Sequence, residues 1–282
     1  MIFDRNEKKQ VVALLGAGSM GTAIVRRIAA GKKILLGDIS TQALERVSDD
    51  FRRSGYDVET QVVNALEKES VEAFAKKAAE LGPVMYFIDT AGASPNQASP
   101  EHIVALDMVG TGYAVDAFGQ VMAEGGAGLI ISSQAAYMYP IPNEDELQIV
   151  NAATDELAAL PIVRNVAMQN SGLAYMIAKR VNHLQAQRAA ATTWRERRAR
   201  INTISPGIIV TPLAYDEFNA IGDLYQEMID ASAARRVATS DEIADAAAFL
   251  LGEHATFING TDLLIDGGVI PSIRTGMFKL QG

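Results

Sequence analysis

The sequence predicts an α/β protein in which helices cover both faces of a doubly wound parallel sheet. Two observations predict this class. Short apolar runs alternate with longer amphipathic segments along most of the 282 residues, which is the order expected of repeated strand and helix units. The apolar runs are almost uninterrupted, as in strands buried on both faces. No composition break divides the chain, so we expect a single domain over residues 1–282.

The individual elements follow from the same pattern. Five amphipathic segments predict helices, and several of them end at a glycine, the residue that most often terminates a helix. These helices are expected at residues 22–30, 41–53, 70–81, 100–123 and 241–251. The apolar runs predict strands at residues 11–15, 34–36, 61–63, 84–88, 129–131, 201–204 and 263–265.

One segment, residues 137–170, departs from this alternation. It contains Pro140, Pro142 and Pro161, an acidic stretch at residues 144–146, and one expected short helix that begins at Thr154. A long irregular segment inside a compact domain is often a binding element. Two interpretations remain open at this point: a wall of the active site, or a surface insertion without a role.

Composition excludes several classes of function. The 25 Lys and Arg residues against 34 Asp and Glu give a net charge of −9, which argues against a nucleic-acid partner. The chain has no cysteine, which excludes disulfides and thiolate chemistry and suits the cytoplasm. No apolar run approaches the ~20 residues of a membrane span. His102, His183 and His254 lie far apart in sequence, so we expect no metal site.

A glycine-rich turn follows the first expected strand and has the spacing G-x-G-x-x-G. Such a turn brings backbone amides and a helix N-terminus toward a pyrophosphate, as in a Rossmann-type dinucleotide site. Asp38 lies 22 residues after Gly16, where a carboxylate accepts hydrogen bonds from ribose hydroxyls. A carboxylate there favours NAD over NADP, although a turn-forming aspartate is the alternative. The predicted cofactor loop is Gly16-Ala17-Gly18-Ser19-Met20-Gly21.

A tyrosine and a lysine four residues apart suggest acid–base chemistry. Tyr175 and Lys179 share one face of an expected helix. A free tyrosine with a pKa of ~10 is a poor base at neutral pH, but a neighbouring ammonium stabilises its phenolate. This pair follows a strand that ends at Ser132-Ser133 and precedes the segment 202–212.

Taken in order, these motifs resemble those of the short-chain dehydrogenase/reductase family over nearly the whole chain. The ordered set consists of the glycine loop, Asp38, Thr90-Ala91-Gly92, Ser133, Tyr175 with Lys179, Pro206-Gly207 and Asp266-Gly267-Gly268. The resemblance implies that Tyr175 is the general acid/base and that Ser133 holds the substrate oxygen. It also implies that Lys179 binds the nicotinamide ribose and lowers the pKa of the tyrosine.

The resemblance further implies the remaining cofactor contacts. Pro206, Gly207, Ile209 and Thr211 stand where the family holds the nicotinamide carboxamide. Ala91 and Gly92 belong to the loop after the fourth strand, and Asn64 and Ala65 stand where an aspartate usually contacts adenine. Asp107 occupies the position of an asparagine whose backbone supports a proton-relay water, and we place it with the catalytic residues.

Four departures from the family pattern accompany this assignment. The glycine loop is one residue shorter than usual, and Asp89-Thr90-Ala91-Gly92 replaces N-N-A-G. Asn64 and Asp107 replace an aspartate and an asparagine, respectively. The asparagine contact is largely made by main chain, so we expect an aspartate to keep the water, add charge and retain activity.

Spacing points to one branch of the family. Ser133 and Tyr175 are 42 residues apart, whereas the family usually needs about a dozen. The insertion resembles, in position and length, that of the bacterial 3-alpha-hydroxysteroid dehydrogenase/carbonyl reductase branch, which suggests steroids or bulky ketones as substrates. Residues 212–236 are expected to form an apolar substrate lobe. Core packing of a helix is an equally weighted explanation for those apolar residues.

We therefore expect an NAD(H)-dependent oxidoreductase that interconverts a hydrophobic secondary alcohol and a ketone. The alternative is a non-catalytic NAD(H)-binding sensor or partner-binding protein on the same scaffold. A third class, reductases of imines or 2-hydroxy acids, does not account for the Tyr175 and Lys179 pair. The resemblance also implies a homodimer or homotetramer.

Overall fold

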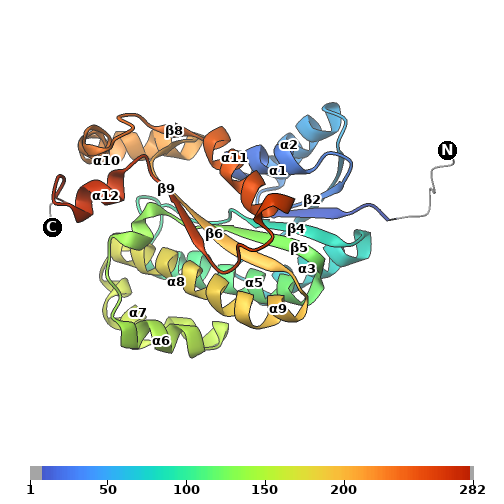
Figure 1. Cartoon of the computed structure of the whole chain (residues 1–282), viewed down its shortest axis with the longest axis horizontal. Coiled ribbons are helices and arrows are strands. Elements are labelled where there is room, and N and C mark those ends of the chain that lie inside the picture. Colours follow the sequence, from blue (N-terminus) through green and yellow to red (C-terminus); the bar gives the residue numbers. More distant parts are fainter. Residues whose placement is uncertain (1–7, 280–282) are drawn as a thin grey trace.

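A single seven-stranded parallel sheet organises the chain. The computed structural model describes residues 8–279, apart from the side chains of residues 212–221. Within this part of the chain, the strand order is β3-β2-β1-β4-β5-β6-β9, and helices cover both faces (Figure 1). The predicted fold class is confirmed. The strands are β1 Val11–Leu15, β2 Lys33–Asp38, β3 Asp57–Val62, β4 Val84–Asp89, β5 Met122–Ile131, β6 Arg200–Pro206 and β9 Asp262–Ile265.

Alternate residues of each strand face opposite helical layers. Val12 and Leu14 of β1 pack on one face with α1, α2 and α11, whereas Val11 and Leu15 pack on the other with α3, α5 and the end of α8. All four side chains are at most 1% exposed, as expected for a sheet buried on both sides. The helices are α1 Ser19–Ile28, α2 Thr41–Arg53, α3 Lys68–Leu81, α4 Pro100–Ile103, α5 Thr111–Val121, α8 Ser171–Ala191, α9 Thr193–Glu196, α10 Pro212–Ala231, α11 Ser240–Leu251 and α12 Val269–Arg274.

The direction of winding reverses between β1 and β4, which is where such sheets bind ligands. The loops that follow these two strands are hydrogen-bonded to each other. The amide of Thr90 donates to the carbonyl of Leu15 at 2.8 Å, and Thr90 Oγ1 donates to the carbonyl of Gly16 at 2.7 Å. The glycine loop is therefore held against the loop after β4.

The helix predicted over residues 100–123 is interrupted. A π-helical turn, Val104–Gly110, lies between α4 and α5. Two side chains of α8 bond to carbonyls of this turn: Asn182 Nδ2 donates to that of Asp107 at 2.7 Å and Gln185 Nε2 to that of Met108 at 2.8 Å. This support from a neighbouring helix stabilises a geometry that a sequence pattern does not reveal.

Residues 137–170 form more regular structure than the sequence predicted. The expected short helix at Thr154 is a 3-10 turn, Thr154–Ala159, and it is one of several helical pieces. The prediction missed α6 Asn143–Asn151, whose first turn carries the acidic residues 144–146. Carboxylates are favourable at a helix N-terminus, so this stretch is a helix start. The other pieces are α7 Pro161–Asn165 and the 3-10 turn Ala167–Gln169, and a further 3-10 turn, Gln134–Tyr137, leads into the segment.

This segment forms a further layer outside α8 (Figure 1). Its buried apolar residues, among them Ile149, Leu157 and Val163, share one cluster with residues of α4, the π-helical turn and α8. An ion pair between Arg180 of α8 and Glu146 of α6, 2.6 Å long, adds a polar contact. The segment is thus packed on the domain rather than extended into solvent.

Candidate active site

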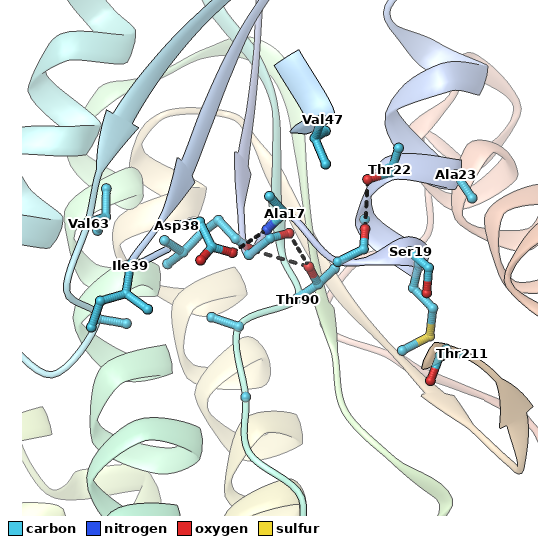
Figure 2. A pocket seen from close by; sticks show the side chains of 18 of the residues that line it. Ala17, Ser19, Thr22, Ala23, Asp38, Ile39, Val47, Val63, Thr90 and Thr211 are labelled. Atoms are coloured by element: carbon cyan, nitrogen blue, oxygen red, sulfur yellow. Dashed lines mark hydrogen bonds between the residues drawn. The ribbon is translucent and has the colours of Figure 1, made fainter. Parts of the chain in front are cut away.

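A cleft of about 990 Å³ lies at the reversal point of the sheet (Figure 2). It is bounded by the loops after β1, β2, β3 and β4 and by the start of α11. Many of the predicted cofactor-binding residues line it together. They are Gly16, Gly18, Ser19, Met20, Gly21, Asp38, Asn64, Ala65, Ala91, Gly92 and Thr211.

The three loop glycines meet different steric demands. Gly16 has a φ of +91°, and a Cβ there would lie 2.7 Å from the amide nitrogen of Ala91. At Gly21 a Cβ would lie 2.7 Å from Leu14 Cδ1. At Gly18, by contrast, a Cβ would meet nothing within 4 Å, so the backbone is open to the cleft. A tight turn, an open approach and close helix packing are the three roles of a dinucleotide loop, and the shorter loop meets them.

Asp38 links the glycine loop to the turn after β2. Its Oδ2 accepts a hydrogen bond from the amide of Ala17 at 2.7 Å, and its Oδ1 accepts one from the amide of Ser40 at 2.8 Å. Figure 2 shows the side chain between Ala17 and Ile39 at the edge of the cleft. Each carboxylate oxygen has a second lone pair, so the group has capacity to accept ribose hydroxyls.

The sequence prediction missed two arginines at this end of the cleft. Arg26 of α1 and Arg46 of α2 both line it. Arg26 forms an ion pair with Asp50 and lies 4.9 Å from the centre of the Phe51 ring, whereas Arg46 is exposed. The signal was available in the helical periodicity of α2, which places Arg46 one turn before Asp50 on one face.

The end of the cleft near Asn64 combines exposed apolar side chains with a stabilised turn. Ile39 and Leu66 are 65% and 39% exposed, respectively. Asn64 Oδ1 accepts from the amide of Leu66 at 3.1 Å, and its Nδ2 donates to Glu67 Oε1 at 2.8 Å. Asn64 therefore stabilises the turn after β3, and the exposed apolar surface is formed by Ile39 and Leu66.

The predicted reaction residues lie just after β5, on α8 and on the π-helical turn, next to this cleft but not among the residues that line it. Ser133 follows β5, and its Oγ accepts from the amide of Ala135 at 3.2 Å, which leaves the hydroxyl hydrogen to donate. Tyr175 is half-buried on α8, and the Nζ of Lys179 lies 5.3 Å from its ring centre. Ser132 Oγ donates to the main-chain carbonyl of Lys179 at 2.8 Å. This last bond joins the two elements that carry the predicted chemistry.

Gly92 connects the cleft to the reaction residues. It lines the cleft, and a Cβ at this position would lie 2.8 Å from Asp107 Oδ1 and 3.3 Å from Lys179 Nζ. Asp107 and Lys179 are both buried directly behind it. A side chain at position 92 would therefore separate the cofactor cleft from the lysine.

The charged groups in this region alter one another's proton affinity. Burial raises the pKa of Asp89 to about 7 and also raises the pKa of Asp107 above its usual value. Burial alone would lower the pKa of Lys179, but the charges of Asp107, Tyr175 and Asp89 together raise it. Lys179 therefore stays an ammonium at neutral pH, as stabilisation of a phenolate requires.

The predicted nicotinamide segment is held by main-chain contacts. The amide of Gly207 donates to the carbonyl of Ile265 at 2.8 Å, and a Cβ at Gly207 would lie 2.7 Å from Asp266 Cα. Ile209 begins the short strand β7 Ile209–Val210, which pairs with β8 Ala238–Thr239. Of this segment, Thr211 lines the cleft, whereas Pro206, Gly207 and Ile209 do not.

Among the described residues, no group of three or more His, Asp or Glu side chains is arranged to hold a metal. In the same part of the chain, no helix is both long enough and apolar enough to cross a bilayer.

Comparison with known proteins identifies the family. A family model described as enoyl-(acyl carrier protein) reductase matches residues 159–270. The chain is 38% identical over 269 residues to a short-chain dehydrogenase/reductase of Alternaria brassicicola, covering 93% of this chain and 96% of that protein. It is 28% identical over 192 residues to a 3-alpha-hydroxysteroid dehydrogenase/carbonyl reductase of Comamonas testosteroni, covering 67% of this chain and 73% of that protein.

A solved structure agrees with the fold. The short-chain dehydrogenase/reductase of Serratia marcescens superposes with a TM-score of 0.72 at 19% identity, covering 93% of this chain and 98% of that one. The nearly full-length match to the Alternaria protein carries the assignment further, because its identity is high enough to indicate common descent. This chain therefore belongs to the short-chain dehydrogenase/reductase family of NAD(P)-dependent oxidoreductases.

Proposed function

We propose that the protein is an NAD(H)-dependent oxidoreductase that interconverts a hydrophobic secondary alcohol and its ketone. The observation that carries this proposal is the position of the Lys179 ammonium. It lies beside the ring of Tyr175 and behind Gly92 of the cofactor cleft. A tyrosine with a buried cation at its side is suited to proton transfer next to a bound dinucleotide.

Each reaction residue has one task in this proposal. When bound, the nicotinamide ring supplies or accepts the hydride. Tyr175 takes the hydroxyl proton at its Oη during alcohol oxidation and returns it during ketone reduction. Lys179 stabilises the phenolate, and Ser133 donates its hydroxyl hydrogen to the substrate oxygen. The open backbone at Gly18 and the N-terminus of α1 are suited to the pyrophosphate.

The substitution Tyr175→Phe tests this proposal, because it removes the proton donor and keeps the ring. We expect kcat/KM to fall by ~10²–10⁴, while NADH affinity, measured by fluorescence titration, changes little. Tyr86→Phe, a substitution at a half-buried tyrosine within β4, is the control and should leave both values near wild type. A Tyr175→Phe variant that keeps most of its rate would contradict the assignment.

The preference for NAD rests on Asp38, whose carboxylate would repel a 2′-phosphate. We expect Asp38→Ala to lower kcat/KM with NAD and to reduce discrimination against NADP by about tenfold or more, as one charge contact of 1.4 kcal/mol implies. Arg46→Gln removes the exposed cation at the same edge of the cleft and should weaken NADP use in the Asp38→Ala background. A wild-type protein that prefers NADP would contradict this interpretation.

The substrate class is supported by apolar side chains on two elements. Tyr139 of the insertion packs in the same cluster as Tyr175, which supports its role as a wall of the active site. Met138 shares another apolar cluster with Leu224, Tyr225 and Met228 of the 212–236 lobe. Met228 is buried, so core packing explains part of this lobe. Leu213, Tyr215, Phe218 and Ile221 lie outside the described side chains.

Steroid-like or cyclic ketones are the first compounds to assay, because the relative from Comamonas testosteroni is named for a hydroxysteroid and for carbonyl substrates.

Our proposal includes a cytoplasmic homodimer or homotetramer. The insertion contacts both α5 and α8, through Thr154 to Asp116 at 2.6 Å and Glu146 to Arg180. It therefore changes the surface through which these two helices would associate with a second copy.

A further inference from the structure

Three charged groups are buried together behind the cofactor cleft. Asp107, Asp89 and Lys179 are 0%, 2% and 5% exposed, respectively. They come from the π-helical turn, the end of β4 and α8. Buried charges are costly unless they are paired, and here one ammonium faces two carboxylates. At most one carboxylate can be fully balanced by this lysine.

Hydrogen bonding indicates which group depends most on the lysine. Asp107 Oδ1 accepts from the amide of Ala93 at 2.8 Å. Among the described residues, its Oδ2 is buried without a hydrogen-bond partner. Asn182 Nδ2 bonds to the main-chain oxygen of Asp107, not to its carboxylate. A negative charge on this side chain must therefore be stabilised mainly by a nearby cation.

Lys179 is that cation. Its Nζ and Asp107 Oδ1 both lie within 3.3 Å of the position that a Cβ at residue 92 would occupy. The charge of Asp107 raises the pKa of Lys179 more than the charge of Asp89 does. The charge of Asp107 also contributes to the raised pKa of Asp89. Asp107 is thus the carboxylate coupled most closely to Lys179.

We propose that Asp107 is the ionised counter-ion of Lys179 and that it sets the proton affinity of Tyr175 by offsetting part of the ammonium charge. This proposal rests on the proposed function of Tyr175. The ammonium stabilises the phenolate, and a carboxylate next to the ammonium weakens that stabilisation. Tyr175 then holds its proton to a higher pH than Lys179 alone would allow. Asp107 is a positioning residue for charge, acting through Lys179.

Other charged groups around this turn are accounted for. His102 of α4 is exposed, and its charge lowers the pKa of Asp107. The acidic groups of the other elements packed on the turn bond elsewhere. Asp116 of α5 accepts from Thr154 at 2.6 Å, and Asp155 pairs with Lys68 at 3.0 Å and accepts from Tyr113 at 2.6 Å.

The test replaces Asp107 with its neutral isostere. Asp107→Asn keeps an oxygen for the amide of Ala93 and removes the negative charge. We expect the pKa of Tyr175 to fall by about one unit, the lower end of the effect of a close charge. Two measurements report it: phenolate absorbance of the protein without cofactor, taken as the difference from Tyr175→Phe, and the acidic limb of kcat/KM for alcohol oxidation.

A matched control lies in the same cluster. Asp89→Asn is also an isosteric loss of a buried carboxylate, but the charge of Asp89 acts less strongly on Lys179 than that of Asp107 does. It should shift both readouts by no more than a third as much. A purely structural role for Asp107 would change stability or rate without moving either titration.

The outcomes separate this inference from the proposed function. A lower phenolate pKa in Asp107→Asn supports the inference even if no tested alcohol is turned over. Unchanged or raised values, or an equal shift in Asp89→Asn, overturn it while leaving the role of Tyr175 intact. If Asp107→Asn does not fold, Asp107→Ser removes the same charge with a smaller side chain. Failure of both variants to fold also overturns the inference, since the carboxylate would then serve the fold.

Discussion

Two buried polar clusters lie one turn apart on α8, and they differ in how fully their groups are hydrogen-bonded. The first surrounds Lys179 and contains Asp107 and Asp89. The second surrounds His183 and contains Asp262, which is 8% exposed at its side chain. Asp107 Oδ2 and Asn182 Oδ1 in the first cluster are buried without a partner among the described residues. In the second cluster, both oxygens of Asp262 are bonded.

The second cluster joins the insertion to the edge of the sheet. Asp262 Oδ2 accepts from Tyr137 Oη at 2.6 Å. Its Oδ1 accepts from Thr203 Oγ1 at 2.5 Å and Ser205 Oγ at 2.9 Å, and lies 3.2 Å from His183 Nε2. The guanidinium of Arg180 lies 3.3 Å from His183 Nδ1. Because a guanidinium only donates, Nδ1 is the acceptor in this contact, and Nε2 is placed to donate to Asp262 Oδ1.

The comparison indicates how the hydrogen bonding of a buried carboxylate is related to its role in this protein. A fully bonded buried carboxylate fixes neighbouring elements, since each lost partner leaves an unsatisfied group behind. A carboxylate whose stabilisation depends on one lysine changes the properties of that lysine instead. The saturated cluster therefore serves the fold, and the unsaturated cluster beside the cleft serves the proposed chemistry. Four predictions test this division.

The largest expected effect comes from comparing one substitution in the first cluster with one in the second. Lys179→Met should lower kcat/KM by ~10²–10⁴, because the phenolate of Tyr175 loses its cation. His183→Gln, one turn further along the same helix, should leave kcat/KM within the same order of magnitude and lower the midpoint of urea unfolding. Steady-state kinetics and denaturation of both variants make the comparison. Equal losses of activity would show that the two clusters do not divide the roles.

Removal of the saturated carboxylate should have the largest effect on stability. Asp262→Ala leaves Tyr137, Thr203, Ser205 and His183 without their acceptor, and we expect a loss of ~3–5 kcal/mol. Asp262 is buried, but its bonds to His183, Thr203 and Tyr137 lower its pKa overall. Its contribution is therefore complete above about pH 4 and is lost as the pH falls through the lowered value.

Urea unfolding at neutral and acidic pH checks this prediction, with an unchanged m-value as the sign of a pure stability effect. Asp245→Ala is the matched control. Asp245 is 72% exposed in its ion pair with Arg27, and surface pairs contribute at most ~1 kcal/mol. A similar loss in both variants would contradict the importance of the saturated cluster.

The first cluster should show the opposite dependence on pH. Burial raises the pKa of Asp89 to about 7, so the folded protein binds this proton more tightly than the unfolded chain does. The resulting stabilisation is complete below about pH 4 and is lost as the pH rises through 7. The shift implies a ceiling of ~4 kcal/mol, and coupling to Lys179 makes ~2 kcal/mol our expectation.

Asp89→Asn removes this titration, so its free energy of unfolding should depend less on pH between 4 and 7 than that of the wild type. Chemical unfolding at several pH values provides the measurement. Asp107→Asn serves as a comparison within the cluster. Parallel curves for wild type and Asp89→Asn would show that Asp89 titrates at an ordinary pKa.

The sequence predicted the sheet because strand signals are local. All seven strands were expected, and β1 matched residue for residue, since buried parallel strands are continuous apolar runs. The strand prediction at residues 129–131 captured only the end of β5, which begins at Met122. Gly125, with a φ of +78°, lies within that strand and obscures its pattern. The cleft residues were found because their spacing is a sequence motif.

The structural features that the sequence did not predict depend on contacts between residues far apart in the chain. The π-helical turn is supported by Asn182, 75 residues after Asp107. The saturated cluster joins residues 125 positions apart, from Tyr137 to Asp262. No spacing rule brings such residues together, and an acidic stretch at residues 144–146 resembles a loop until its helix packs on α8. These features come from tertiary packing.

The smallest expected effect tests whether the saturated cluster tolerates the loss of one bond. Tyr137→Phe removes the hydroxyl that donates to Asp262 Oδ2, while three groups still contact Oδ1. Burial, followed by the bond to Asp262, raises the pKa of Tyr137, so this phenol is protonated throughout the neutral range. We expect a loss of ~1 kcal/mol, the usual value of one hydrogen bond. The Arg274 guanidinium, 5.3 Å from the ring centre, keeps its contact with phenylalanine.

The size of this loss decides how the insertion is attached. Tyr137 is the first residue of the segment 137–170, so its bond to Asp262 is the first polar link between the insertion and β9. A loss near 1 kcal/mol with an unchanged KM would mean that apolar packing on α8 holds the insertion and that the bond only adds to it. A loss as large as that of Asp262→Ala, or a raised KM for bulky ketones, would mean that Tyr137 positions this wall. Thermal unfolding and steady-state kinetics, with Tyr86→Phe in β4 as the control, distinguish the two.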